Sequence, residues 1–119
     1  MKLNRWVVIL GSLLLMSGCN LCSDTIKSGS VSQDNALKVT VFIRDCGATT
    51  DFSTILNLRE SSAKFNGDDL GAVIVKGQHR IDLVWDGNTK LRLQCKDCRQ
   101  DEIFKQERSW KDVEISLGR

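Results

Sequence analysis

Two segments with the alternation of a half-buried β-strand lie close together in this chain and constrain its fold more than any other feature. Residues 37–45 (LKVTVFIRD) place apolar side chains at every second position from Leu37 onward. Residues 52–59 (FSTILNLR) repeat the two-residue period that lets a strand bury one face. A compact polar connection, residues 46–51 (CGATTD), joins them. We therefore predict a β-hairpin over residues 37–59.

The rest of the chain also favours strands over helices. Four further segments have strand character: 72–76 (AVIVK), 81–86 (IDLVWD), 89–95 (TKLRLQC) and 110–117 (WKDVEISL). The turn at residues 86–88 (DGN) is the strongest hairpin signal, since Gly and Asn accept the positive φ that such turns require. The only helical candidate, residues 99–108, has too few apolar side chains for an amphipathic helix, so we expect one or two turns at most.

Six short strands with tight turns predict an all-β fold, a small antiparallel meander arranged as one sheet or a sandwich. The hairpins resemble single blades of β-propellers. A full propeller is excluded because the chain has material for one or two blades and no repeat recurs at that period.

The first 18 residues have the organisation of a bacterial signal peptide. Lys2 and Arg5 precede an apolar run over residues 6–16, which is shorter than the roughly 20 residues that a membrane-spanning helix needs. The run ends at Ser17-Gly18-Cys19, which resembles the lipobox of bacterial lipoproteins. Small residues let the scissile bond enter the peptidase, and the Cys19 thiolate accepts the lipid. We expect cleavage after residue 18 and lipidation of Cys19; the alternative is an ordinary signal peptide.

Removing the leader changes the charge and sets the domain boundaries. The precursor has a formal charge of +2, which falls to about zero once Lys2 and Arg5 are lost, so a basic surface for nucleic acid is not supported. Residues 19–36 are predicted to be the lipidated cysteine and a polar tether, with at most a short edge strand at its end. Residues 37–119 are predicted to form a single β domain.

Four cysteines remain after Cys19: Cys22, Cys46, Cys95 and Cys98. An even number in a small exported domain indicates two disulfides, for which three connectivities exist. We favour Cys22–Cys46 with Cys95–Cys98, because the close pair needs little chain to meet. A zinc site made of the four cysteines is a less favoured alternative, because it conflicts with an oxidising compartment.

The CxxC sequence at residues 95–98 also occurs in thiol redox enzymes, where it opens a helix after a strand. This chain lacks the alternating strands and helices of that fold. The acidic Asp97 between the two cysteines disfavours a thiolate. We expect a structural disulfide here.

Residues 44–54 (RDCGATTDFST) resemble the signature of a family of small bacterial lipoproteins and exported proteins of unknown function, whose members typically read RDCGATTGFST. The resemblance continues loosely through residues 81–93 (IDLVWDGNTKLRL) and the closing WKDVEISL. It implies an exported, lipid-anchored protein and assigns no catalytic residue.

Polar side chains gather in and around the hairpin connection: Asp45, Thr49, Thr50, Asp51 and Ser53. Asp and Thr side chains often build such connections by bonding nearby backbone groups, and we favour this structural role. The alternative is a recognition loop made rigid by a disulfide at Cys46.

Other chemically interesting residues have simpler explanations. His79 lies in a polar turn without a GxSxG sequence, so we expect a solvated histidine rather than a catalytic one. Asp68 and Asp69 do not have the spacing of a DxDxDG calcium loop and are expected to be turn residues. Trp85 and Trp110 are expected to pack in the core.

The sequence therefore predicts a non-enzymatic, lipid-anchored module that binds a protein or another envelope component. Its only expected non-protein group is the lipid on Cys19, with no metal. Asn20 rather than Asp follows Cys19, so the signal for inner-membrane retention is absent and an outer-membrane location facing the periplasm is favoured. The alternatives are a purely structural envelope lipoprotein, or a redox or hydrolytic enzyme that uses Cys95 and Cys98 or His79.

Replacing Cys19 with Ser should release the protein from the membrane fraction, because the serine hydroxyl is not a substrate for lipid transfer. Signal peptidase II should then fail to process the precursor. Cell fractionation and mass spectrometry of the amino terminus measure both effects. Unchanged membrane association with normal maturation would contradict the assignment.

Overall fold

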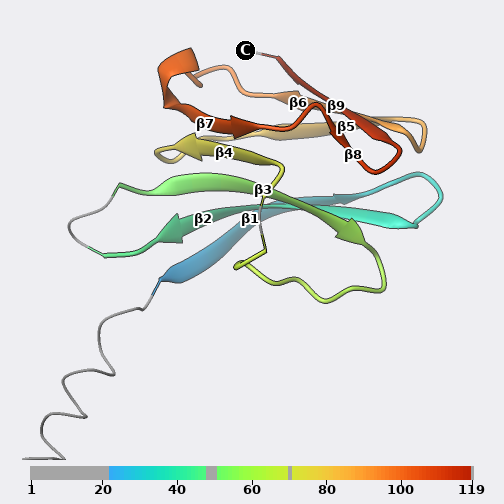
Figure 1. The fold of residues 1–119 in the computed structure, drawn as a ribbon, viewed down its shortest axis with the longest axis horizontal. Coiled ribbons are helices and arrows are strands. Elements are labelled where there is room, and N and C mark those ends of the chain that lie inside the picture. The colour runs from blue at the N-terminus through green and yellow to red at the C-terminus, as the bar shows by residue number, and fades with distance from the viewer. Residues whose placement is uncertain (1–21, 48–50, 70, 119) are drawn as a thin grey trace, which may run out of the picture.

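The computed structural model describes residues 22–47, 51–69 and 71–118, and these form two β-sheets packed face to face (Figure 1). The first sheet is antiparallel, in the order β1 (Ser23–Val31), β2 (Leu37–Asp45), β3 (Ser53–Glu60), β4 (Val73–Lys76), β7 (Ile103–Gln106). The second is mixed, in the order β5 (Asp82–Asp86), β6 (Lys90–Gln94), β9 (Val113–Gly118), β8 (Ser109–Trp110). The predicted all-β class is confirmed, with a single 3-10 turn, η1 (Gln100–Glu102), in the described part of the chain.

The core lies between the sheets and uses the predicted alternation. Val41 and Leu56 face each other across β2 and β3, and both are fully buried. Leu91 of β6 and Ile115 of β9 supply the opposite face. Trp85 and Trp110 pack against this core, as predicted. Burial of apolar surface between the sheets is the main force that holds such a sandwich together.

The outer face of β2 and β3 is also buried, which the sequence did not lead us to expect. Phe42 points away from the core, and the loop of residues 61–69 folds over it (yellow-green in Figure 1). The ring of Phe65 meets that of Phe42 edge to face, with centroids 5.1 Å apart. Arg59 satisfies two buried polar groups beside them, the hydroxyl of Thr40 at 2.8 Å and the amide oxygen of Asn57 at 3.3 Å. The central strands therefore lie in the middle of three layers.

Where the sequence led us to expect a tether, the structure has a nine-residue strand. β1 pairs with β2 along its length, with a bulge between Ile26 and Ser28. Its side chains are almost all exposed, so the apolar alternation that signals a strand is missing. Backbone hydrogen bonds to β2 hold this segment in the sheet instead.

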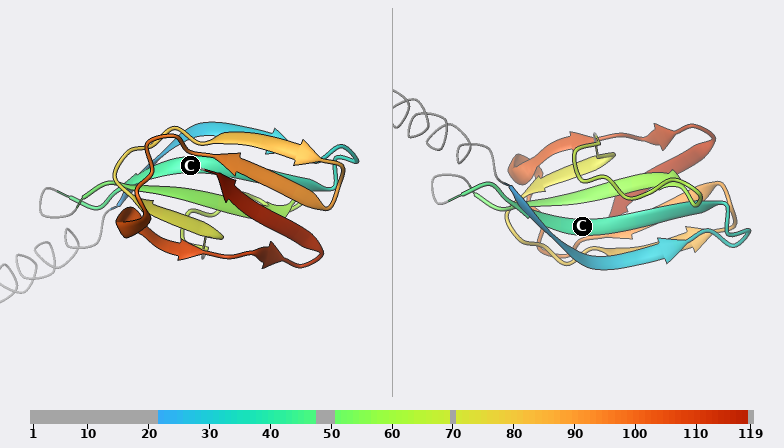
Figure 2. Two further views of the ribbon diagram at one scale, coloured as in Figure 1. Left: turned by 90° about the horizontal axis from the view of Figure 1, so that it is seen from above. Right: turned by 90° about the horizontal axis from the view of Figure 1, so that it is seen from below.

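The predicted helical segment contains only η1, followed by strand β7. The predicted closing strand is split into β8 and β9 by a turn at Lys111, whose φ is 51°. β9 then pairs in parallel with β6, because the chain crosses to the other sheet through β7 before it returns (Figure 2). The predicted antiparallel orientation therefore fails at one pair, β6–β9. The predicted meander is interrupted at two, β4–β7 and β6–β9, because these neighbours are not consecutive in the chain. In the described ranges, no helix has the length and apolar character to cross a membrane.

The predicted hairpin at residues 86–88 is present, with Gly87 at a φ of 73°. Within this turn, the amide oxygen of Asn88 accepts a 2.8 Å hydrogen bond from the backbone N–H of Asp34, in the β1–β2 turn. This bond joins the two sheets at the end of the sandwich opposite the disulfides.

A bidentate ion pair fixes β1 to β2, and a further contact reaches the loop of residues 61–69, called the covering loop below. The guanidinium of Arg44 donates to both carboxylate oxygens of Asp24, at 2.8 and 2.9 Å, and to Asp68 at 3.0 Å. The hydrogen bond from Arg44 holds the pKa of Asp24 below its usual value. Both side chains of the Asp24–Arg44 pair are 22% exposed, so water screens the pair only in part.

Asp24→Asn should lower the free energy of unfolding by about 1 kcal/mol at pH 7, because it removes a charge-assisted, partly screened interaction. The folded-state pKa of Asp24 is depressed, so its contribution is present above the unfolded value of 3.8 and is lost as the pH falls through the folded value. Urea denaturation between pH 7 and pH 2.5 measures this loss.

Asp86→Asn is the matched control for that experiment. Asp86 pairs with Arg92 on the exposed face of the second sheet, where both side chains are about half exposed. Its replacement should change stability by less than about 0.5 kcal/mol. Equal effects of the two substitutions, or an Asp24 effect that does not decrease as the pH falls below 3.8, would contradict our interpretation.

Candidate functional site

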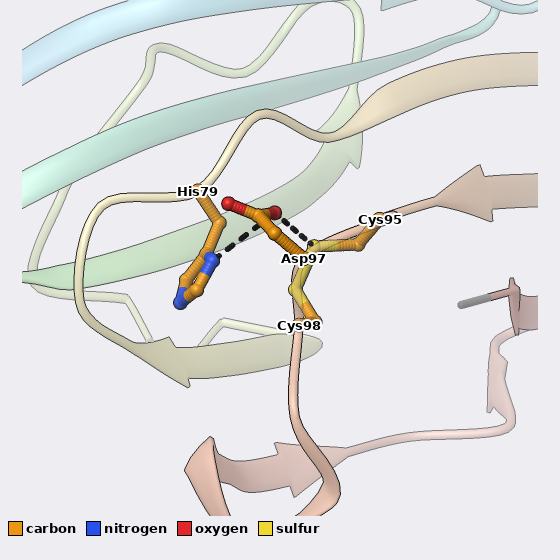
Figure 3. Close-up of side chains that lie close together, drawn as sticks. All are labelled: His79, Cys95, Asp97 and Cys98. Atoms are coloured by element: carbon orange, nitrogen blue, oxygen red, sulfur yellow. Dashed lines mark hydrogen bonds and ion pairs between the residues drawn. A yellow bond between two sulfur atoms is a disulfide. The ribbon is translucent and has the colours of Figure 1, made fainter.

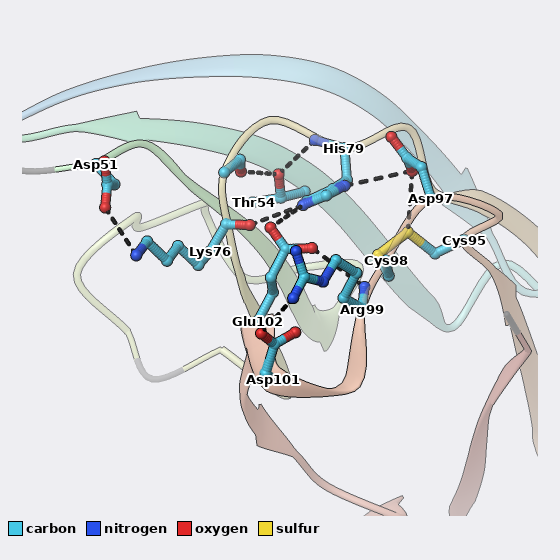
Figure 4. Close-up of polar contacts among 11 residues, drawn as sticks. Asp51, Thr54, Lys76, His79, Cys95, Asp97, Cys98, Arg99, Asp101 and Glu102 are labelled. Carbon is cyan, nitrogen blue, oxygen red and sulfur yellow. Dashed lines mark hydrogen bonds and ion pairs between the residues drawn. A yellow bond between two sulfur atoms is a disulfide. The ribbon is translucent and has the colours of Figure 1, made fainter.

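Three segments that are distant in sequence meet at one end of the sandwich. They are the described ends of the connection between β2 and β3 (residues 46–47 and 51–52), the β4–β5 turn at residues 77–81, and residues 95–102 around η1 (Figures 1 and 4). Both disulfides and the single histidine lie in these segments or directly beside them. This end is the candidate functional site.

The disulfides have the connectivity that we favoured. Cys22–Cys46 joins the residue before β1 to the residue after β2, with Cα atoms 4.0 Å apart. Cys95–Cys98 closes the CKDC loop after β6, and both residues are buried, at 0% and 6% exposure. Burial of both cysteines is typical of a structural disulfide.

The described residues of the polar connection take part in local structure. Asp45 accepts a 3.0 Å hydrogen bond from the backbone N–H of Gly47. Asp51 pairs with Lys76 of β4 at 3.1 Å, and Ser53 opposes Lys76 in the β3–β4 register. Thr49 and Thr50 lie outside the described residues, as does Cys19.

Thr54 connects the central hairpin to the β4–β5 turn (Figure 4). Its side chain is fully buried, where it donates a 2.7 Å hydrogen bond to the carbonyl of Gly77 and accepts a 2.9 Å bond from the backbone N–H of His79. The N–H of Gly77 also bonds to the carbonyl of Phe52 at 2.6 Å. One hydroxyl therefore sets the position of the turn that carries His79.

His79 is not the solvated residue that we predicted, since its side chain is only 8% exposed. Nε2 lies 2.7 Å from the carbonyl oxygen of Lys76 and 3.6 Å from a carboxylate oxygen of Glu102. Nδ1 lies 3.3 Å from Asp97, directly beside the Cys95–Cys98 disulfide (Figure 3). The positive φ of Gly77, 92°, lets the turn fold back, and a side chain there would begin 3.2 Å from Nε2.

The ring is oriented by its contact with Lys76. A carbonyl oxygen only accepts hydrogen bonds, so Nε2 must carry a proton. In the neutral ring, the lone pair then belongs to Nδ1. Among the described residues this buried atom has no hydrogen-bond partner. An imidazole held through one nitrogen, with the other directed at a carboxylate and two sulfurs, is able to bind a proton or a metal ion there.

A groove of about 530 Å³ opens beside His79, between the edge of β1 and the start of β5. Its floor is apolar, formed by Val41, Ile43 and Ile81, and its rim carries Lys27 and the ion pair of Arg80 with Asp82. Sequence reasoning missed this groove because one wall is β1, which has no strand periodicity. The β-bulge that places Lys27 on the rim has no local signal either.

The paired aspartates Asp68 and Asp69 belong to the hydrogen-bonded structure of the loop of residues 61–69. Asp68 binds Arg44, and its backbone N–H bonds to the side chain of Asn66 at 3.0 Å. The N–H of Asp69 bonds to the carbonyl of Asn66 at 3.1 Å. These contacts agree with the turn that we predicted.

Comparison with protein-family models, with curated proteins and with solved structures found no significant match to this chain. The resemblance of residues 44–54 to a lipoprotein signature therefore stays an expectation.

Thr54→Val should lower the free energy of unfolding by about 2 kcal/mol, because it keeps the side-chain shape and leaves the N–H of His79 and the carbonyl of Gly77 without their partner. Chemical denaturation measures the loss, and hydrogen exchange at residues 77–80 should become faster. Thr89→Val, at an exposed position in the β5–β6 turn, should change neither quantity. Equal stability of the two variants would contradict the role of Thr54.

Proposed function

We propose that this protein is a lipid-anchored, non-enzymatic binding module of the bacterial envelope, and that it holds an extended polypeptide segment of a partner protein along β1. The observation that carries the proposal is the groove beside a free strand edge. Its volume, about 530 Å³, is within the range of ligand sites in proteins.

The free edge of β1 favours a polypeptide over a small molecule. β1 is nine residues long and has β2 as its only neighbour among the described strands. The outward backbone groups of such an edge can pair with an added strand. Beyond the bulge, residues 28–31 (SGSV) carry no charge that would repel an incoming chain.

The groove also indicates the chemistry of the partner. In an added strand, alternate side chains point to the same side, so one set can reach the apolar floor at Val41, Ile43 and Ile81. Lys27 on the rim forms no ion pair with any described residue. An acidic side chain next to the apolar ones would pair with it. The preferred partner is therefore an extended segment that combines apolar and acidic residues.

The proposed lipid on Cys19 would place the domain close to the bilayer. Cys22 is fixed to Cys46, so only Asn20 and Leu21 separate the lipidated residue from the folded domain. Three residue steps extend at most about 10 Å. The disulfide end would then lie near the lipid headgroups, and the Asp86–Asn88 end would face away. An outer-membrane location facing the periplasm is part of this proposal.

Photocrosslinking in intact cells tests the partner. A photoreactive phenylalanine analogue placed at Ser28, on the groove wall, should crosslink to one envelope protein, and mass spectrometry should map the contact to an extended apolar and acidic segment. The same analogue at Ser116, on the exposed face of β9, is the control and should not capture that protein. Crosslinks from Ser28 only to lipid or cell wall, or identical products from both sites, would overturn the proposal.

A synthetic peptide of the mapped segment then tests the mode of binding. Lys27→Glu should weaken its affinity at least about tenfold, because two like charges would meet at the rim. Lys90→Glu, on the exposed face of β6, should leave the affinity unchanged. Titration calorimetry measures both, and equal affinities for the two variants would contradict the predicted site.

A further inference from the structure

We propose that the dithiol form of Cys95 and Cys98, together with His79 and Asp97, binds one zinc-class divalent cation, and that closure of the disulfide abolishes this site. The inference does not depend on the proposed binding function. The sequence suggested a zinc site only from the four cysteines, and it did not connect His79 to any of them.

The four potential ligand atoms already converge. One nitrogen of His79, one oxygen of Asp97 and the two sulfurs all lie within 4.8 Å of one another (Figure 3). Ligand atoms around a tetrahedral zinc ion lie about 3.3–3.8 Å apart, given bonds of about 2.0–2.3 Å. Reduction frees the two sulfurs to separate, so shifts of about 1 Å would complete the geometry.

The imidazole has the arrangement of a metal ligand. The proton on Nε2 is held by the carbonyl of Lys76 at 2.7 Å, which directs the lone pair of Nδ1 toward Asp97 and the sulfurs. Metal-bound histidines commonly use such a carbonyl bond on the second nitrogen. Nδ1 is buried without a hydrogen-bond partner among the described residues, and it lies 3.3 Å from a carboxylate oxygen. Two electron-rich atoms at this distance favour a positive charge between them.

The contact between Asp97 and Cys95 also supports a cation site at this position. An oxygen of Asp97 lies 3.6 Å from the sulfur of Cys95. A disulfide sulfur carries no proton, so this contact is not a hydrogen bond in the oxidised protein. Asp97 is 67% exposed, whereas both cysteines are buried. The carboxylate would therefore form the solvent side of the site, through which an ion can enter.

Conversion of the disulfide into the metal-binding dithiol requires only a dithiol reductant. The reductant transfers two electrons and two protons to the Cys95–Cys98 bond and becomes a disulfide itself. The two thiols then lose their protons to solvent when they bind the cation. Two thiolates, one imidazole and one carboxylate form a donor set that suits zinc. The newly exported chain, before oxidation, has the same thiols without any reductant.

Cobalt(II) titration of the full chain in detergent tests the site. The protein used is a Cys22→Ser/Cys46→Ser variant, in which Cys95 and Cys98 are the only cysteines apart from Cys19. After reduction by dithiothreitol and its removal under argon, the variant should bind one cobalt ion per chain with thiolate charge-transfer and tetrahedral d–d absorption. Zinc should displace the cobalt. The oxidised protein should show neither band.

His79→Gln in the same background should weaken cobalt binding by at least about 10–100-fold, since it removes a direct ligand. Asp97→Asn should weaken it as well, whereas Asp101→Asn, on the exposed η1, should not. Failure of the reduced protein to bind, or binding that His79→Gln leaves unchanged, would overturn the proposal. If the reduced double-serine variant is unfolded without metal, cobalt should fold it, as circular dichroism measures, and His79→Gln should abolish this effect. Cobalt binding that leaves the reduced chain unfolded would overturn the proposal.

Discussion

The structure depends on the burial of both faces of the β2–β3 hairpin. Five consecutive residues in each strand, 39–43 and 54–58, are removed from solvent. The second sheet covers one face with apolar side chains, and the loop of residues 61–69 covers the other with the Phe42–Phe65 pair. Polar residues on the loop side are tolerated because Arg59 satisfies them. Among the described residues, β1 and β4 pair directly with this hairpin, and the second sheet packs against it.

Residues 44–47 and 51–54 lie at the end of that hairpin, and several of them hold neighbouring segments in place. Arg44 binds β1 and the covering loop, Cys46 fixes the amino-terminal segment, and Thr54 holds the turn that carries His79. A rigid end of this kind can support the two features that we propose to be functional, the groove beside β1 and the cluster around His79. Both lie where segments distant in sequence meet, and neither interrupts the core.

The strands of the core were predictable because their side chains alternate and their turns contain the residues that tight turns require. β1 and the environment of His79 were not. β1 is an edge strand whose exposed side chains leave no apolar pattern, and it is held by backbone bonds and the Cys22–Cys46 disulfide. His79 is buried by Asp97, Glu102 and the disulfide loop, which come from sequence positions 16 or more residues away.

By itself, the sequence determined the all-β class, the central hairpin, the turn at Gly87 and the short-range pairing of Cys95 with Cys98, since each depends on local periodicity, turn chemistry or chain proximity. Only the tertiary structure decided that β9 runs parallel to β6, that a loop covers the outer face of β2 and β3, and that His79 faces Asp97 beside the disulfide. These features arise when surfaces from distant segments are buried together. Their free energy depends on shape and contact between partners that no local pattern specifies.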